Sequence, residues 1–209
     1  MKVLIVDDHA IVREGARRVL CDEIEGVVVG EAATAPEAIA KAGAGEWDIV
    51  ILDLSIPGRG GLDVLKELHA QRPSLPILVM TMYSEEQYAV RAFRSGAAGY
   101  LTKGSTSREF VTAVRRVAAG GKYVTPSLAE RLVGILAPST YQSAHDGLSD
   151  RELQVLRMLA RGQTVKQIAD ELSLSEKTIS TYRSRLLEKL ALQTTADLIR
   201  YALTTGLVD

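Results

Sequence analysis

The first 120 residues of the chain alternate short apolar runs with stretches of helical periodicity. The apolar runs fall at Lys2–Val6, Val27–Gly30, Ile49–Asp53, Ile77–Thr81 and Gly99–Thr102. Three of these runs are apolar at successive positions rather than at alternate ones, which indicates strands covered on both faces. Helical patterns fill the segments 10–20, 35–44, 61–71, 84–96 and 107–120. This order predicts a doubly wound α/β domain with a parallel five-stranded sheet.

The composition excludes several classes of protein. Hydrophobic residues make up 46% of the chain and charged residues 24%, so we expect folded cores rather than disorder. The first apolar run is interrupted by Asp7 and Asp8, which is not the pattern of a secretory signal, and no run is long enough to span a bilayer. Because Cys21 is the one cysteine, an internal disulfide and a thiolate metal cluster are excluded. We expect a soluble cytoplasmic protein with no membrane partner.

Polar residues follow the predicted strands at the ends where parallel sheets hold their sites. Asp7 and Asp8 follow the first strand, Asp53 and Thr81 end the third and fourth, and Lys103 follows the fifth. Clustered carboxylates repel one another unless a cation lies among them, and Mg²⁺ suits an oxygen site that handles phosphate. A carboxylate beside a metal-bound phosphate can act as a nucleophile, while the lysine and the hydroxyl bind phosphoryl oxygens.

Each of these residues also has an ordinary structural interpretation. Asp8 can cap the first helix, Thr81 can be a plain strand-end hydroxyl, and Lys103 can be a solvated surface lysine. Four strand ends that carry the required groups in one domain favour the phosphate chemistry.

Four segments resemble the receiver domain of bacterial two-component response regulators. They read VLIVDDHAIVREG, ILDLSIPGRGGLDVL, LVMTMYSEE and AAGYLTKGSTSREF. The resemblance implies a flavodoxin-like receiver at residues 1–122, in which Asp53 is the phosphoacceptor and a sensor histidine kinase is the phosphodonor. It also implies that Mg²⁺ is held by Asp7, Asp8, Asp53 and the backbone carbonyl of Ser55.

The same resemblance assigns the residues that respond to phosphorylation. Thr81 and Tyr100 correspond to the switch pair of the family, and Lys103 corresponds to its phosphate-binding lysine. One departure from the family pattern is Gly104, because receivers commonly have a proline after this lysine.

After the first domain the strand pattern disappears. Residues 126–136 have helical spacing and residues 137–147 mix Pro, Ser, Thr and Gly, so we interpret 123–146 as a linker that contains a helix. Later helical patterns fall at 149–160, 165–172, 175–190 and 195–205. A tight turn around Ser173–Ser175 joins the second and third of these helices, which predicts an all-α four-helix domain with a helix-turn-helix at residues 147–209.

The third helix of this domain has one apolar stripe and a polar remainder. Ile179, Leu186 and Leu190 form the stripe, and the helix carries two more positive than negative charges. Hydroxyls flanked by cations suit a recognition helix in a major groove, although an ordinary solvated helix has the same mixture. Residues 147–209, which contain LSDRELQVLRMLARG and IADELSLSEKTISTYRSRLLEKL, resemble the LuxR/FixJ-type DNA-binding domain. We therefore predict contacts to double-stranded DNA from Lys177, Thr178, Ser180, Thr181, Tyr182, Arg183, Ser184 and Arg185.

Together the two resemblances indicate a phosphorylation-controlled transcription regulator rather than an enzyme. A homodimer is expected because a domain with so little net charge binds DNA weakly alone. The helix at 195–205 is either its pairing surface or part of the core. Two alternatives stay open: a Mg²⁺-dependent aspartyl-phosphate hydrolase, disfavoured by Ser55 where a second carboxylate is usual, and a constitutive DNA-binding protein whose first domain only dimerises.

Overall fold

The computed structural model describes residues 1–57, 60–130 and 144–208. The chain divides into two compact units, Met1–Ala137 and Pro138–Asp209. Within the described ranges, every helix is too short or too polar to cross a membrane.

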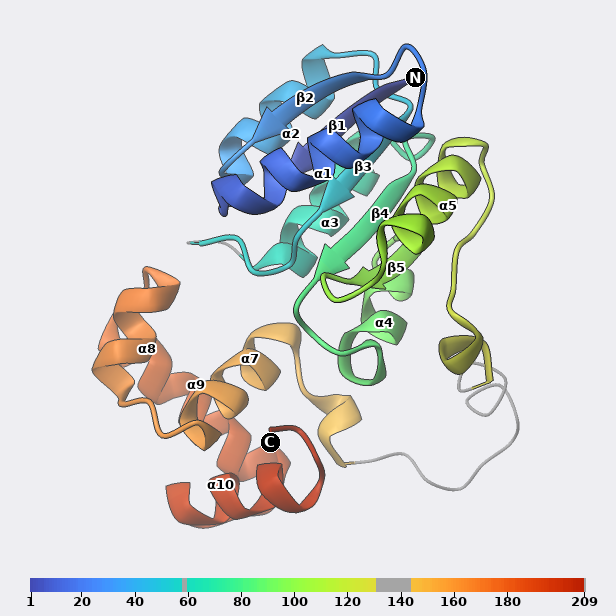
Figure 1. The fold of residues 1–209 in the computed structure, drawn as a ribbon. Helices are drawn as coiled ribbons and strands as arrows, with labels where there is room; N and C mark the ends of the chain where they lie inside the picture. Colours follow the sequence, from blue (N-terminus) through green and yellow to red (C-terminus); the bar gives the residue numbers. More distant parts are fainter. Residues whose placement is uncertain (58–59, 131–143, 209) are drawn as a thin grey trace. The chain divides into compact units, whose positions relative to one another are not determined.

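A parallel sheet of five strands forms the centre of the first unit, in the order β2-β1-β3-β4-β5 (Figure 1). The strands are β1 (Lys2–Val6), β2 (Val28–Ala32), β3 (Ile49–Leu52), β4 (Ile77–Thr81) and β5 (Gly99–Thr102). The helices between and after them are α1 (Ala10–Glu23), α2 (Ala35–Ala44), α3 (Gly61–Gln71), α4 (Glu85–Arg94) and α5 (Ser107–Ala118). This architecture confirms the predicted doubly wound α/β fold.

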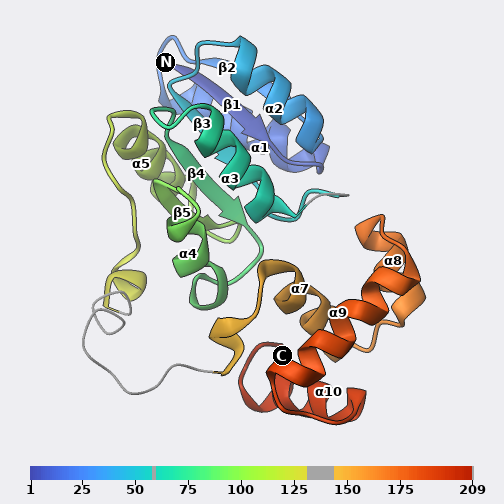
Figure 2. The same ribbon diagram turned by 180° about the vertical axis from the view of Figure 1, so that it is seen from behind.

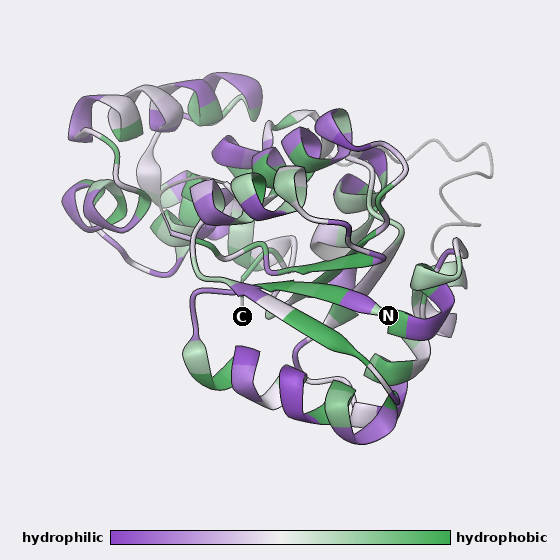
Figure 3. Cartoon of the chain, turned by 90° about the horizontal axis from the view of Figure 1, so that it is seen from above, coloured by the Kyte–Doolittle hydropathy of each residue, from purple (hydrophilic) through white to green (hydrophobic). Residues whose placement is uncertain are grey.

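The strands are apolar on both sides because helices cover both faces of the sheet. Leu4 and Val6 pack in one core with α2, α3 and α4, whereas Val3 and Ile5 pack in another with α1 and α5. Figures 1 and 2 show these two layers from opposite sides. In Figure 3 the strands are mainly hydrophobic while the helices alternate between the two colours. The unbroken apolar runs of the sequence thus correspond to strands buried on both faces.

The second strand is shifted relative to its prediction. It was expected at 27–30 and lies at Val28–Ala32, because pairing with β1 sets its register from Lys2↔Val28 to Val6↔Ala32. As an edge strand it tolerates the polar Glu31 beside Gly30. The predicted third strand included Asp53, but β3 ends at Leu52.

The start of the predicted linker belongs to the first unit and packs against its sheet and core. Tyr123 forms a parallel bridge with Gly99, the first residue of β5. Leu128 is 1% exposed and belongs to the core shared with α2, α3 and α4. Residues 126–130 are helical, and the rest of the predicted linker helix, 131–136, lies outside the described residues.

The second unit is all-helical in its described residues. After a short 3₁₀ turn (Ala144–Gly147) it contains α7 (Asp150–Ala160), α8 (Val165–Leu172), α9 (Glu176–Lys189) and α10 (Thr195–Thr204). The helices begin where short polar side chains cap them, at Ser149, Thr164, Ser175 and Thr194. Ser173 ends α8 with a left-handed backbone, φ 53°, so that α9 follows after a tight turn. The predicted helix-turn-helix is confirmed.

Candidate functional site

Asp7, Asp53 and Lys103 meet at the carboxyl edge of the sheet. Both aspartates are 1% exposed. Nζ of Lys103 lies 2.7 Å from Oδ2 of Asp7 and 2.7 Å from Oδ2 of Asp53. The sheet ladder positions the two carboxylates, since the main-chain N–H of Asp7 donates to Ala32 and that of Asp53 donates to Val6. The structure therefore brings together three residues that the strand ends predicted.

Asp8 and His9 extend this acidic cluster along the β1–α1 loop. Oδ1 of Asp8 lies 2.9 Å from Nδ1 of His9, and the main-chain N–H of His9 donates to Oδ1 of Asp7 at 2.9 Å. One ligand atom from each of Asp7, Asp8, His9 and Asp53 can be chosen so that all lie within 4.8 Å of one another. Three carboxylates and one lysine leave the cluster with an excess of negative charge.

The donor set of this cluster fits a hard divalent cation. Oδ2 of Asp7 and Oδ1 of Asp8 are buried, and they lie 2.7 Å from Nζ of Lys103 and 2.9 Å from Nδ1 of His9. Buried carboxylate oxygens are costly unless enough positive charge lies close to them, and one lysine does not balance three carboxylates. Mg²⁺ binds through one or two carboxylates and keeps several waters, which this arrangement permits. Asp7, Asp8 and Asp53 are therefore compatible with a metal site.

Lys103 is held in its charged form. Burial acts to lower the pKa of Lys103, but hydrogen bonds to Asp53 and Asp7 and the charges of both carboxylates outweigh it, so the pKa is raised. The main-chain N–H of Lys103 also donates to the carbonyl of Thr81 at 2.8 Å. The Lys103–Gly104 peptide bond is trans. The ammonium is thus fixed between two acids and available to a phosphoryl oxygen.

The loop after Asp53 is fixed beside the carboxylate. The main-chain N–H of Ser55 donates to Oδ1 of Asp53 at 3.1 Å. Helix α3 begins so close to this loop that a Cβ on Gly61 would lie 2.3 Å from Cα of Leu54. Glycine at this position lets the helix approach, which keeps Ser55 near the cluster. The carbonyl of Ser55 stays a predicted metal ligand.

The predicted switch pair, Thr81 and Tyr100, is fully buried, with both residues 0% exposed. Oη of Tyr100 donates to the main-chain carbonyl of Tyr83 at 2.9 Å. The N–H of Tyr83 lies 3.5 Å from Oγ1 of Thr81, and the ring of Tyr83 stacks on Tyr88 with centroids 4.4 Å apart. Both predicted switch residues are therefore connected to the same β4–α4 loop.

The sequence did not single out Arg13 of α1, which contacts the main chain of Asp7, or Glu31 of β2, which contacts Arg13. Nη1 of Arg13 donates to the main-chain carbonyl of Asp7 at 2.7 Å, and its Nε donates to Oε2 of Glu31 at 3.0 Å. One signal was available. Cations are disfavoured near a helix N-terminus, so an arginine close to the start of α1, where the first turn has no acidic residue, indicates a partner elsewhere.

Helix α9 presents a polar face in the second unit. Four of the residues predicted to contact DNA are exposed: Lys177, Thr181, Ser184 and Arg185. The other four are partly buried: Thr178, Ser180, Tyr182 and Arg183. Of these, Tyr182 packs against the hydrophobic core of the unit, and Oγ1 of Thr178 lies 2.8 Å from Oγ of Ser175 at the helix cap. DNA contacts from all eight residues stay predictions.

Two exposed hydroxyls of α9 bond back to the helix. Oγ1 of Thr181 donates to the carbonyl of Lys177 at 2.9 Å, and Oγ of Ser184 donates to the carbonyl of Ser180 at 3.1 Å. A hydroxyl keeps acceptor capacity while it donates in this way, and its proton can rotate toward another acceptor. This face can therefore offer both donors and acceptors.

Glu152 holds the C-terminal end of α9 against α7. The residue is 2% exposed, and its Oε2 accepts hydrogen bonds from Nζ of Lys189 and from the main-chain N–H of Ser149, both at 2.7 Å. Burial acts to raise the pKa of Glu152, but the hydrogen bonds from Lys189 and Ser149 outweigh it, so the pKa is lowered. An ionised carboxylate thus fixes the helix that carries the polar face.

Comparison with known families matches both units. The family described as response regulator receiver domain matches residues 3–115. The family described as bacterial regulatory proteins, luxR family, matches residues 146–202.

Known proteins and solved structures resemble the chain over nearly its whole length. Response regulator GacA of Pseudomonas aeruginosa is 40% identical over 211 residues, which cover 100% of this chain and 98% of GacA. Response regulator UvrY of Escherichia coli K12 is 36% identical, and the match covers 100% of this chain and 96% of UvrY. The structure of the RcsB–DNA complex is 30% identical, covers 100% of this chain and 99% of its own, and has a TM-score of 0.59. RcsB from Salmonella enterica serovar Typhimurium, bound to a promoter in the presence of phosphomimetic BeF₃⁻, is 31% identical and has a TM-score of 0.60. The match covers 96% of this chain and 97% of the RcsB chain.

Proposed function

The chain belongs to the response regulators that join a receiver domain to a LuxR-family DNA-binding domain, and from this premise we propose that Asp53 accepts a phosphoryl group from a sensor histidine kinase. The observation that carries the assignment is the placement of Lys103 Nζ, 2.7 Å from Oδ2 of Asp53 and among two further carboxylates. In this function the protein is a transcription regulator of a two-component system and acts in the cytoplasm.

The transfer to Asp53 is a displacement at phosphorus. An oxygen of the Asp53 carboxylate forms a bond to the phosphorus of a phosphohistidine, the P–N bond breaks, and the imidazole leaves with its electron pair. Asp7, Asp8, Asp53 and the carbonyl of Ser55 would hold Mg²⁺, which would supply positive charge to the phosphoryl oxygens. Lys103 turns an N–H from the carboxylate to a phosphoryl oxygen, and hydrolysis later returns Asp53 to its free form.

The new charge acts on the β4–α4 loop. The hydroxyl of Thr81 turns to donate to the phosphoryl group, and the ring of Tyr100 follows into the space that it leaves. Because Tyr100 is hydrogen-bonded to the carbonyl of Tyr83, its movement changes the loop that leads into α4. The phosphorylation state thereby biases the surface formed by α4 and β5.

The DNA-binding part comprises residues 147–209, with α9 in the major groove. Its exposed lysine and arginine reach phosphates, and its hydroxyls reach base edges. The net charge of this part is small, so two copies are needed for tight binding, and phosphorylation favours a homodimer that reads two half-sites. The solved structures of RcsB, one in complex with DNA and one bound to a promoter in the presence of phosphomimetic BeF₃⁻, support this combination of phosphorylation and DNA binding.

One experiment tests the function as a whole. The full-length protein is incubated with MgCl₂ and acetyl phosphate, the modified residue is located by mass spectrometry, and binding to a promoter fragment is followed by fluorescence anisotropy. We expect one phosphoryl group on Asp53, no label with EDTA, and a change in DNA affinity that Asp53→Asn abolishes.

Each alternative has its own signature in the same experiment. DNA affinity and oligomeric state that are the same for the wild type and Asp53→Asn under acetyl phosphate support a constitutive DNA-binding protein. Continuous turnover of a phosphate ester supports a hydrolase. A phosphoryl group on a residue other than Asp53 contradicts the proposal directly.

A further inference from the structure

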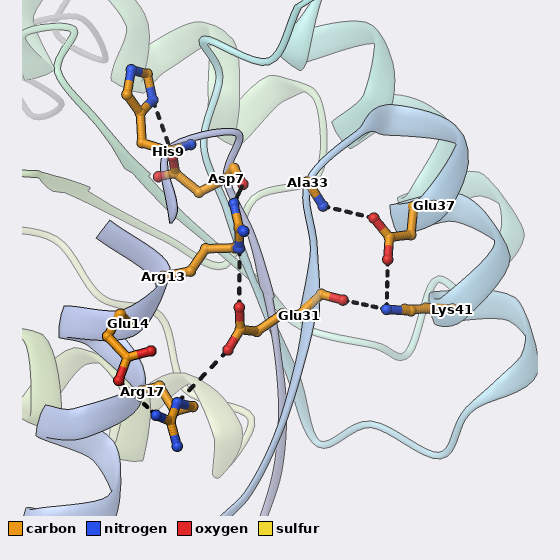
Figure 4. A network of polar contacts seen from close by, with 9 residues as sticks. All are labelled: Asp7, His9, Arg13, Glu14, Arg17, Glu31, Ala33, Glu37 and Lys41. Atoms are coloured by element: carbon orange, nitrogen blue, oxygen red, sulfur yellow. Dashed lines mark hydrogen bonds and ion pairs between the residues drawn. The ribbon is translucent and has the colours of Figure 1, made fainter. Parts of the chain in front are cut away.

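Arg13 joins the β1–α1 loop to the neighbouring strand β2. Its guanidinium donates from Nη1 to the main-chain carbonyl of Asp7 at 2.7 Å and from Nε to Oε2 of Glu31 at 3.0 Å (Figure 4). The side chain of Arg13 is 16% exposed, whereas that of the nearby Arg17 is 44% exposed. The contact is therefore made in a largely desolvated position, where a charge-assisted hydrogen bond is strong.

Four of the contacts of Asp7 hold it in position. Its main-chain N–H donates to Ala32, its Oδ1 accepts from the N–H of His9, and its Oδ2 pairs with Lys103. The fourth contact is the bond from Arg13 to its carbonyl. This carbonyl lies just past the last residue of β1, where the strand ladder ends. Arg13 is thus the side chain that fixes the main chain between β1 and the start of α1.

Glu31 orients Arg13 without contact to the cluster itself. Its carboxylate accepts from Nε of Arg13, and its other oxygen lies 3.8 Å from Nε of Arg17 (Figure 4). Arg17 also donates to Glu14 at 2.7 Å. Lys41 donates to the main-chain carbonyl of Glu31 at 2.5 Å, which ties this part of β2 to α2. The network therefore places two arginines on one carboxylate.

The positive charge of Arg13 is unfavourable at this position unless a negative charge offsets it. Arg13 is close to the N-terminus of α1, where a cation is disfavoured, and it brings positive charge near a predicted cation site. The pairing with Glu31 neutralises that charge while the guanidinium keeps a donor for the loop. A planar fork with separate donors can satisfy both partners, which the single ammonium of a lysine does less well.

We propose that Arg13 is a positioning residue of the metal site. It fixes the β1–α1 loop so that Asp7 and Asp8 present their oxygens together, and Glu31 sets its orientation. The inference rests on the proposed function, because it assumes that Mg²⁺ binds this cluster. It adds to the site a residue of α1 whose side chain binds the main chain of the loop and which is not itself a metal ligand.

The test measures Mg²⁺ binding and loop exchange in the full-length, unphosphorylated protein. Isothermal titration with MgCl₂ gives the affinity of the wild type, Arg13→Ala, Arg13→Lys and Arg17→Ala. Loss of a residue that orients a metal ligand typically weakens binding about 10-fold or more, so this is expected for Arg13→Ala. Arg13→Lys should lie between Arg13→Ala and the wild type. Arg17→Ala is the matched control, since it removes the other arginine of Glu31 and leaves the loop contact; its affinity should equal that of the wild type.

Hydrogen exchange of the metal-free protein supplies a readout that does not depend on Mg²⁺. The amide of His9, which donates to Asp7, should exchange faster in Arg13→Ala and unchanged in Arg17→Ala, while the amides of β4 stay as protected as in the wild type. Glu31→Ala should have a smaller effect on the same amide, and the double variant Arg13→Ala/Glu31→Ala should resemble Arg13→Ala.

The outcomes separate this inference from the proposed function. Equal Mg²⁺ affinity and equal exchange at His9 in Arg13→Ala and the wild type overturn it, as does an equal weakening in Arg17→Ala. A wild type that binds no Mg²⁺ overturns both the proposed metal site and the assignment of Arg13 to it. If Arg13→Ala unfolds the first unit, the comparison of Arg13→Lys with the wild type decides in the same way.

Discussion

Nζ of Lys103 lies 2.7 Å from Oδ2 of Asp53, and the same ammonium lies 2.7 Å from Oδ2 of Asp7. One cation therefore separates two buried carboxylates that come from different strands. A divalent ion bound to the same carboxylates would also offset their repulsion. In the proposed function, Lys103 and Mg²⁺ would therefore have overlapping electrostatic roles in the unphosphorylated protein.

Lys103→Ala should make the stability of the first unit depend on Mg²⁺. Without the ammonium, Asp7 and Asp53 repel each other and lose charge-assisted hydrogen bonds, which contribute about 1.5–3 kcal/mol. Saturating MgCl₂ should recover much of this loss, because a ligand that binds only the folded state stabilises it. Thermal unfolding of the variant and the wild type, each with MgCl₂ and with EDTA, measures the difference. Equal Mg²⁺ effects in both proteins would contradict the shared role.

Glu85 should control how firmly the start of the linker is attached to the first unit. Its Oε2 accepts from Oγ1 of Thr125 at 2.6 Å and from Oγ of Ser127 at 3.3 Å, next to the buried Leu128. We expect Glu85→Ala to speed amide exchange at Leu128 and Ala129 about tenfold, because a hydrogen bond to a charged group contributes about 1.5 kcal/mol.

Glu85→Gln is the matched variant for this contact, since its side chain keeps an acceptor oxygen without the charge. Its effect on exchange should be smaller than that of Glu85→Ala. Hydrogen exchange at Leu128 and Ala129, with the β4 amides as an internal reference, compares the two variants with the wild type. Exchange at Leu128 that is unchanged in Glu85→Ala would show that the burial of Leu128 and the bridge at Tyr123 hold the segment without Glu85.

The sequence predicts the central strands well because burial on both faces leaves little ambiguity. Ile77–Thr81 was predicted with its observed bounds, and every residue of that strand is buried. The same reasoning misplaced the edge strand β2, because an apolar run indicates which residues are buried and not which residues pair with the neighbouring strand. Pairing with β1 extends it to Ala32, past the polar Glu31.

The candidate site was predictable where it depends on strand ends. Asp7, Asp53 and Lys103 each follow a strand, and parallel strands carry such residues to one edge. Arg13 was not predictable in the same way, because its partner is a main-chain carbonyl that no sequence pattern reveals. Glu85 was missed because neither it nor Thr125 ends a predicted strand, so no sequence pattern brings the two side chains together.

Acid should weaken the attachment of α9 to α7 through Glu152. The pKa of Glu152 is lowered in the folded protein, so its ionised form stabilises the fold above about pH 4.3, the value of an unfolded glutamate. That stabilisation is lost as the pH falls through the lowered folded-state pKa. Protection of the α7 amides, corrected for intrinsic exchange, should therefore decrease below this pH.

Glu152→Gln should remove most of that acid dependence. The variant keeps an acceptor for Ser149 but loses the charge opposite Lys189, which should reduce protection at pH 7 by about 1 kcal/mol. Glu188→Gln, on the exposed side of α9, is the matched control and should behave as the wild type. An acid profile of Glu152→Gln as steep as that of the wild type would assign the loss to another group.

Lys177 should contribute to DNA binding through phosphate charge and not through base recognition. Lys177 is exposed near the start of α9. The hydroxyl of Thr181 donates to the main-chain carbonyl of Lys177, and Lys177→Ala keeps this carbonyl, so the contacts within the helix stay intact. Loss of one phosphate contact should make the slope of log affinity against log salt less steep by about 0.9, with similar weakening on specific and unrelated duplexes. Lys2→Ala, which removes an equal charge from β1 in the other unit, should leave the slope unchanged. Fluorescence anisotropy over a salt series measures both variants. An unchanged slope in Lys177→Ala would place this lysine away from the backbone, and weakening confined to one sequence would make it a base-reading residue.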